Sequence, residues 1–192
     1  VRLIMHTDPR DKHGQDLAHI INHLNANDGR IMLSTKKIPP EALATMYNMV
    51  DCTINISDAE GFGLATLESL ACQTPIIATM TGGLQEQVTD GENWFGIGLE
   101  PSSKAIIGSQ DIPWIYEDRL SEEVVVDAML NMYNMSKEER DQLGFAGRGH
   151  VMKNYNFDNF CKQWDEIFTM VHDEMGSWDT RKPHRNWEFK EL

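Results

Sequence analysis

Cysteine is scarce in this sequence, and its spacing excludes two structural classes. Cys52, Cys72 and Cys161 are the 3 cysteines among 192 residues, and no C-x-x-C pair occurs. Disulfide-stapled domains and structural zinc sites need paired or regularly spaced cysteines. The sequence therefore predicts neither a disulfide framework nor a structural zinc site, and it favours a reducing, cytoplasmic location.

Basic residues are also in short supply. The chain has 17 Lys and Arg against 30 Asp and Glu, a formal net charge of −13. A field of this sign repels polyanions, so the composition disfavours binding to nucleic acid or to an anionic membrane surface. We therefore expect no nucleic-acid partner, whereas a small anion bound in a local pocket is compatible with this charge.

Long apolar runs are missing as well. No run approaches the roughly 18 residues of a membrane span, and no signal-peptide pattern opens the chain. With 41% apolar and 24% charged residues, the composition is that of a globular protein of about one domain. Because Val1 opens the chain inside an apolar run, we expect it to be a piece of a longer protein.

Strands and helices alternate along the chain as far as Gly91. Short apolar or β-branched runs predict strands, and apolar residues at helical spacing predict helices between them. The strands are predicted at 1–6, 30–34, 52–57 and 75–79, and the helices at 17–24, 40–50 and 63–72. This alternation is typical of an α/β, Rossmann-like fold with a parallel sheet flanked by helices, whose ligands bind beyond the carboxyl ends of the strands.

The pattern changes after Gly91. Residues 92–118 predict a long irregular stretch with two short strands, and three helices follow. Ser121 and Ser136 are predicted to cap the first two helices, the second with Glu139 in a capping box. An apolar stripe from Phe157 to Val171 marks the third. We place one domain at 1–175 and a tail at 176–192.

The segment from Ser57 to Glu68 carries the most chemical information. It follows a predicted strand and runs into a helix, where α/β sheets place their ligands. Glycines in it, Gly61 and Gly63, allow a tight turn and a close approach to a ligand. Unpaired N–H groups of Gly63, Leu64 and Ala65 at the helix start predict an anion site that needs no basic side chain.

Glu68 is the second chemical signal of this segment. A helical wheel places it about 40° from Leu64, so we expect the carboxylate at or beside the inward face of the helix. A buried carboxylate needs hydrogen-bond donors, and the vicinal hydroxyls of a sugar would supply them. The alternative donor is a neighbouring serine or backbone N–H. Glu60, before the glycine turn, is either a ligand-binding carboxylate or a solvated loop residue.

Glu60 and Glu68 reproduce the E-x7-E motif of the family 4 retaining glycosyltransferases. The likeness covers most of the chain, with matching segments at 41–51, 60–72, 74–79, 81–91 and 143–168. This resemblance implies a GT-B fold of two Rossmann-like domains, of which this chain would be the C-terminal, donor-binding one. The whole enzyme would transfer a sugar from a nucleotide-sugar to an unknown glycan, lipid or protein acceptor, with retention of anomeric configuration. The alternative is a non-catalytic nucleotide- or sugar-binding Rossmann-like module.

The resemblance also implies roles for individual residues. Glu60 would be the catalytic-site residue that hydrogen-bonds the hydroxyls of the donor sugar, and Glu68 would bind the ribose. The remaining donor-binding positions would be Gly61, Phe62, Gly63, Leu64 and Ala65 around the diphosphate, Ser34 and Thr35 beside the base, and Gly82 and Gly83 in the adjacent wall. The family is metal-independent, and the nucleotide-diphosphate sugar is a co-substrate rather than a cofactor.

The sequence also departs from the family pattern. Gln73 stands where the family usually has Gly, and the acceptor-binding N-terminal domain, the first strand and the phosphate-binding Arg and Lys have no counterpart. Arg10 and Lys12 are an alternative basic pair, although one strand rather than two separates them from Glu41. Without the central first strand, the first two strands lack a neighbour that links them to the third. We expect the chain alone to rearrange its sheet, to form a homo-oligomer or to be marginally stable.

Overall fold

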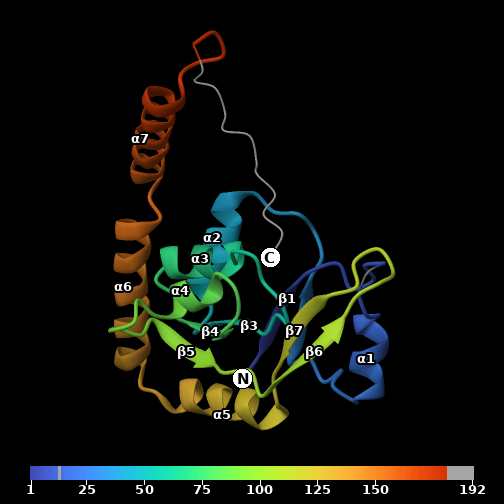
Figure 1. Cartoon of the computed structure of the whole chain (residues 1–192). Coiled ribbons are helices and arrows are strands. Elements are labelled where there is room, and N and C mark those ends of the chain that lie inside the picture. Colours follow the sequence, from blue (N-terminus) through green and yellow to red (C-terminus); the bar gives the residue numbers. More distant parts are fainter. Residues whose placement is uncertain (13, 181–192) are drawn as a thin grey trace. The chain divides into compact units, whose positions relative to one another are not determined.

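A computed structural model of the chain describes residues 1–12 and 14–180. Most of the tail predicted at 176–192 therefore lies outside the described residues. The chain forms two compact units, Val1–Leu43 and Ala44–Leu192. Figure 1 shows the elements along the chain.

The first unit contains a parallel strand pair. Strands β1 (Leu3–His6) and β2 (Ile31–Ser34) pair in parallel, and helix α1 (Leu17–His23) connects them. The side chain of Asp16 caps α1 by accepting a hydrogen bond from the N–H of His19. This strand–helix–strand order confirms the prediction for the first 34 residues.

Helix α2 (Pro40–Met49) leads into the second unit, which has a three-stranded parallel sheet. Its strands, in spatial order, are β3 (Thr53–Asn55), β4 (Ile76–Thr79) and β5 (Gly96–Leu99). Helix α3 (Leu64–Ala71) connects the first two strands, and the short helix α4 (Leu84–Val88) connects the next two. Every residue of the central strand β4 is buried, as expected for a strand covered on both faces.

Alternate residues of β4 face opposite sides of the sheet and so build two separate apolar clusters. Ile76 packs with Leu70 of α3 and with Val151 of α6 (Lys137–Asn154). Ile77 packs on the other side with Met132 of α5 (Glu122–Asn134). Helices therefore cover both faces of the sheet (Figure 1), and the predicted α/β fold class is confirmed.

The strands also fall into separate sheets, as expected from the sequence. Among the described residues, no strand pairing joins β1 and β2 to the sheet of β3, β4 and β5. The prediction of two strands within 92–118 is wrong, because this stretch contains β5 and an antiparallel pair, β6 (Ser103–Ile107) and β7 (Ile115–Arg119). Strand β5 is not predicted from the sequence because it contains Gly96 and Gly98, and glycine is depleted in strands. At Gly96 the backbone passes so close to Ile76 that a Cβ would overlap it.

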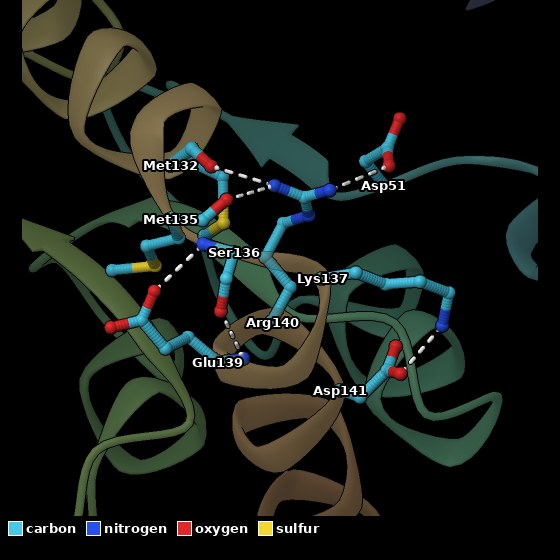
Figure 2. A network of polar contacts seen from close by, with 8 residues as sticks. All are labelled: Asp51, Met132, Met135, Ser136, Lys137, Glu139, Arg140 and Asp141. Atoms are coloured by element: carbon cyan, nitrogen blue, oxygen red, sulfur yellow. Dashed lines mark hydrogen bonds and ion pairs between the residues drawn. The ribbon is translucent and has the colours of Figure 1, made fainter.

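The junction between α5 and α6 is held by the Arg140 side chain. Nη1 of Arg140 donates to the carbonyl oxygens of Met135 at 2.5 Å and Met132 at 3.4 Å, and Nη2 lies 3.4 Å from Asp51 Oδ1. Figure 2 shows how this one guanidinium reaches both the end of α5 and Asp51. Because Asp51 stands just before β3, Arg140 links the helix junction to the strand that leads into the predicted site.

Helix α6 begins with the predicted capping box. The N–H of Glu139 donates to Ser136 Oγ at 3.2 Å, and the N–H of Ser136 donates to Glu139 Oε2 at 2.7 Å. Both bonds are drawn in Figure 2. They satisfy two N–H groups that the helix itself leaves unpaired, which fixes where α6 starts.

Helix α7 (Phe157–Met175) carries an apolar stripe that is not buried. None of its residues is buried, although Phe160 and Trp164 lie with ring centroids 6.2 Å apart, and Trp164 and Phe168 5.2 Å apart. The aromatic rings of the stripe therefore contact one another along the helix.

In the described part of the chain, no helix combines the length and apolar character needed to cross a membrane.

Candidate functional site

The glycine turn after β3 leaves the start of α3 uncapped. Gly63, the N-cap of α3, has a φ of 89° in the left-handed region, and a Cβ on it would lie 2.5 Å from Leu84 Cδ2. Glycine is therefore required here. Among the described residues no side chain caps this helix end, so the N–H groups of Leu64 and Ala65 have no acceptor within the helix. Leu64 and Ala65 are exposed, whereas Gly63 is buried. The anion site that the sequence predicts at this helix start stays a prediction.

The structure brings the second predicted glycine pair against this turn. The N–H of Gly83 donates to the carbonyl of Gly61 at 3.1 Å, and a Cβ on Gly83 would lie 2.6 Å from Phe62 O. Gly82 has a φ of 49°, and its Cα faces the carbonyl of Glu60 so closely that a Cβ would overlap it. The segments at 60–63 and 82–83 therefore share a backbone contact that larger residues would break.

Two buried polar side chains, Gln87 and Thr66, stabilise the contact between the segments at 60–63 and 82–83. Neither was predicted from the sequence. Gln87 of α4 is fully buried; its Nε2 donates to Phe62 O at 2.6 Å, and its Oε1 accepts from Thr66 Oγ1 at 2.5 Å. Thr66 Oγ1 also lies 2.9 Å from the carbonyl of Gly63. The position of polar Gln87 next to apolar Val88 indicates in the sequence that this side chain needs a hydrogen-bond partner. That the partner is Thr66 of α3 follows only from the structure.

The expected inward position of Glu68 is wrong. The buried residues of α3 are Thr66, Ser69 and Leu70, whereas Glu68 is exposed. The wheel was referenced to Leu64, which is itself 67% exposed, and this shifted the inferred inward face by about half a turn. Neither a serine nor a backbone N–H binds the carboxylate in the described contacts; Glu68 Oε2 accepts from the hydroxyl of Tyr47 at 3.0 Å.

Strand β7 holds the loop that precedes Glu60. Arg119 Nη1 lies 2.7 Å from Asp58 Oδ2, and Nη2 lies 2.7 Å from Glu117 Oε2. The N–H of Asp118 donates to the carbonyl of Asp58 at 2.7 Å. These contacts fix the chain two residues before the partly buried Glu60, and the charge of Arg119 is already balanced by two carboxylates.

Ser34 and Thr35, the predicted base-binding residues, belong to the first unit. They stand at the carboxyl end of β2, where Ser34 Oγ lies 2.9 Å from His6 Nδ1. In the same unit, Nε of Arg10 lies 3.8 Å from Oδ2 of Asp16. The other predicted site residues belong to the second unit, in which backbone contacts join the segments at 60–63 and 82–83.

A cavity of about 600 Å³ lies elsewhere, along α4 and α6, and none of the predicted site residues lines it. His150 lines it and donates from Nε2 to the carbonyl of Glu86 at 2.8 Å. Asp90 also lines it, and N–H groups of Asn93 and Glu92 lower the pKa of its carboxyl to about 2. These polar groups already bind other parts of the fold.

In residues 1–12 and 14–180, no group of three or more His, Cys, Asp or Glu side chains is arranged to hold a metal.

Comparison with known proteins identifies the family. The family described as Glycosyl transferases group 1 matches residues 13–128, which is more than half of the 192 residues. The chain belongs to this family. A D-inositol 3-phosphate glycosyltransferase of Corynebacterium urealyticum is 30% identical over 133 residues, which cover 69% of this chain and 26% of that protein. The aligned segments span 12%, 16% and 26% of the length of three curated relatives.

Solved structures of glycosyltransferases share the fold. A sucrose-phosphate synthase of Thermosynechococcus elongatus aligns with a TM-score of 0.67 and 22% identity, over 90% of this chain and 39% of that chain. The C-terminal domain of a group 1 family protein of Francisella tularensis aligns with a TM-score of 0.51 and 24% identity, over 74% of this chain and 62% of that one. The fold is therefore that of the C-terminal half of GT-B glycosyltransferases. Family and fold favour a glycosyltransferase domain over a non-catalytic binding module.

Proposed function

We propose that this chain is the donor-binding domain of a retaining family 4 glycosyltransferase that uses a nucleotide-sugar. The observation that carries this proposal is that Glu60 precedes the uncapped start of α3 along the chain, whereas Glu68 lies within the helix. Membership of the group 1 family supports it, because the E-x7-E spacing then lies within a glycosyltransferase domain.

The start of α3 suits the diphosphate of such a donor. The N–H groups of Leu64 and Ala65 and the positive end of the helix dipole favour an anion without a lysine or arginine. The same groups would stabilise the charge that develops on the departing diphosphate. This explains how a chain of net charge −13 could bind an anionic donor.

The two carboxylates would bind the hydroxyls of the donor on either side of the diphosphate. Glu60 would accept hydrogen bonds from the sugar in the catalytic position, and Glu68, about 6 Å along the helix from its start, would accept them from the ribose. The exposure of Glu68 supports this role, since a ligand can reach the carboxylate. Gly82 and Gly83 would form the adjacent wall, and Ser34 and Thr35 would border the base.

The proposal extends to the partners of the whole enzyme. The acceptor would be a glycan, lipid or protein bound mainly by an N-terminal domain, and neither a metal nor another cofactor would take part. The chain alone would rearrange its sheet, form a homo-oligomer or be marginally stable. The enzyme would act in the cytoplasm without a nucleic-acid partner. The scattered cysteines and the acidic charge support the last two points.

The test is a panel of UDP-, GDP- and ADP-glucose, titrated calorimetrically into the full-length protein and then incubated with candidate acceptors. We expect at least one donor to bind with a Kd of about 1 mM or tighter. The transferred sugar should keep the anomeric configuration of the donor, as read from the anomeric proton coupling. Inversion would contradict the retaining mechanism, and binding without turnover on any acceptor would favour the non-catalytic module.

A further inference from the structure

Tyr47 is the partner of the Glu68 carboxylate. Its hydroxyl lies 3.0 Å from Glu68 Oε2, and the contact joins α2 to α3 across 21 residues of sequence. Glu68 is exposed, and a long exposed carboxylate side chain samples many rotamers unless a partner holds it. The hydrogen bond from Tyr47 selects one of those orientations.

The backbone of Tyr47 is itself held by buried hydroxyl groups. The side chain of Thr74 donates to the carbonyl of Tyr47 at 2.8 Å, and the carbonyl of Thr74 accepts from Ser69 Oγ at 3.0 Å. Ser69 Oγ lies 2.7 Å from Thr53 Oγ1. Both Ser69 and Thr74 are buried, so these bonds tie the end of α2 to the inner side of α3 and to β3. Tyr47 therefore approaches Glu68 from a fixed position.

The direction of the hydrogen bond follows from the protonation of Tyr47. Burial raises the pKa of its phenol, and the adjacent Glu68 carboxylate raises that pKa further. The phenol thus stays protonated at neutral pH and donates, while a carboxylate can only accept. The bond occupies Oε2 and leaves Oε1 of Glu68 open to a ligand in the part of the chain that the structure describes.

We propose that Tyr47 is a positioning residue that orients Glu68 for the vicinal hydroxyls of the donor ribose. This inference rests on the proposed function, because it takes Glu68 to be the ribose-binding carboxylate. A carboxylate held in place before binding loses less conformational freedom when the diol arrives. The role of Tyr47 is therefore visible in the discrimination between a ribose that carries both hydroxyls and one that lacks them.

The test compares nucleoside diphosphates with their 2′,3′-dideoxy counterparts. UDP, GDP and ADP are titrated calorimetrically into the full-length protein, and the one that binds is compared with its dideoxy form in each variant. Tyr47→Phe removes only the hydroxyl, and we expect the preference for the ribose form to fall about fivefold, as for the loss of one hydrogen bond. The affinity for the dideoxy form should not change. Tyr133→Phe, an exposed tyrosine on α5, is the control and should leave both affinities unchanged.

The outcomes separate this inference from the proposed function. In a Glu68→Ala background the preference for the ribose form should vanish, and adding Tyr47→Phe should have no further effect. If Tyr47→Phe weakens both forms equally, or leaves the preference intact, Tyr47 has no positioning role. If Glu68→Ala keeps the preference, the assignment of Glu68 to the ribose is wrong, whatever Tyr47 does.

A second variant covers the case in which Tyr47→Phe does not fold. Glu68→Asp keeps the charge but withdraws the carboxylate from the Tyr47 hydroxyl by one methylene. We expect this variant to lose the preference for the ribose form to the same extent. Full preference in Glu68→Asp would overturn the positioning role.

Discussion

At the scale of single residues, the glycines at 61 and 82 differ in what their Cα atoms face. Gly82 has a φ of 49° and faces the carbonyl of Glu60, whereas a Cβ on Gly61 would meet open space. We expect Gly82→Ala to lower the free energy of unfolding by about 2 kcal/mol or more, because it adds backbone strain and a steric overlap. Gly61→Ala is the matched control and should stay within about 0.5 kcal/mol of the wild type. Equal urea midpoints for the two variants would show that the 60–63 and 82–83 segments are not packed as described.

Single residues also show how much of the candidate site could be predicted. The glycine turn and the two carboxylates follow from local spacing, because a turn and a helix start are local structures. The contact between Tyr47 and Glu68 does not, since it depends on how α2 packs beside α3. A tyrosine in the apolar stripe of α2 offered a hint, because a partly buried phenol usually finds a partner for its hydroxyl.

At the scale of elements, Arg140 determines how α5 joins α6. The Arg140 side chain is 19% exposed and donates to the carbonyl oxygens at the end of α5, while the side chain of its partner Asp51 is 82% exposed. Arg140→Ala should lower the free energy of unfolding by about 1 to 3 kcal/mol, because two partly buried carbonyl groups lose their donor. Lys137→Ala is the control and should cost less than about 0.5 kcal/mol, since it breaks only an exposed ion pair with Asp141. Urea unfolding in which both variants lose the same stability would rule out this role for Arg140.

The elements themselves were largely predictable, and the exceptions have physical causes. Periodicity predicts β1 to β4 and α1 to α3, because each carries a local apolar pattern at strand or helix spacing. Strand β5 is not predicted because Gly96 and Gly98 give it little strand propensity. Glycine is nevertheless needed at Gly96, because the strand packs closely on β4 there. The antiparallel pairing of β6 and β7 depends on contacts across the loop at 108–114, which local pattern does not encode.

At the scale of the whole molecule, the structure shows a sheet in separate parts. The pair β1–β2 and the sheet β3–β4–β5 share no strand among the described residues, as the absence of a counterpart to the family's first strand predicts. The exposed apolar stripe of α7 adds a second surface without a buried residue. The aligned segment spans 26% of the length of one curated relative. The domain boundary at residue 175 stays a prediction.

The central claim is that Glu60 and Glu68 bind the nucleotide-sugar donor, and calorimetry tests it most directly. The donor that binds the full-length protein is titrated into the wild type, Glu60→Ala, Glu68→Ala and the control Glu174→Ala on α7. We predict that each of the first two substitutions weakens binding at least about tenfold, since a hydrogen bond to a charged group contributes about 1.5 to 3 kcal/mol. The control should bind as the wild type does, and urea midpoints should agree among all four proteins. Unchanged affinity in both Glu60→Ala and Glu68→Ala would contradict the account.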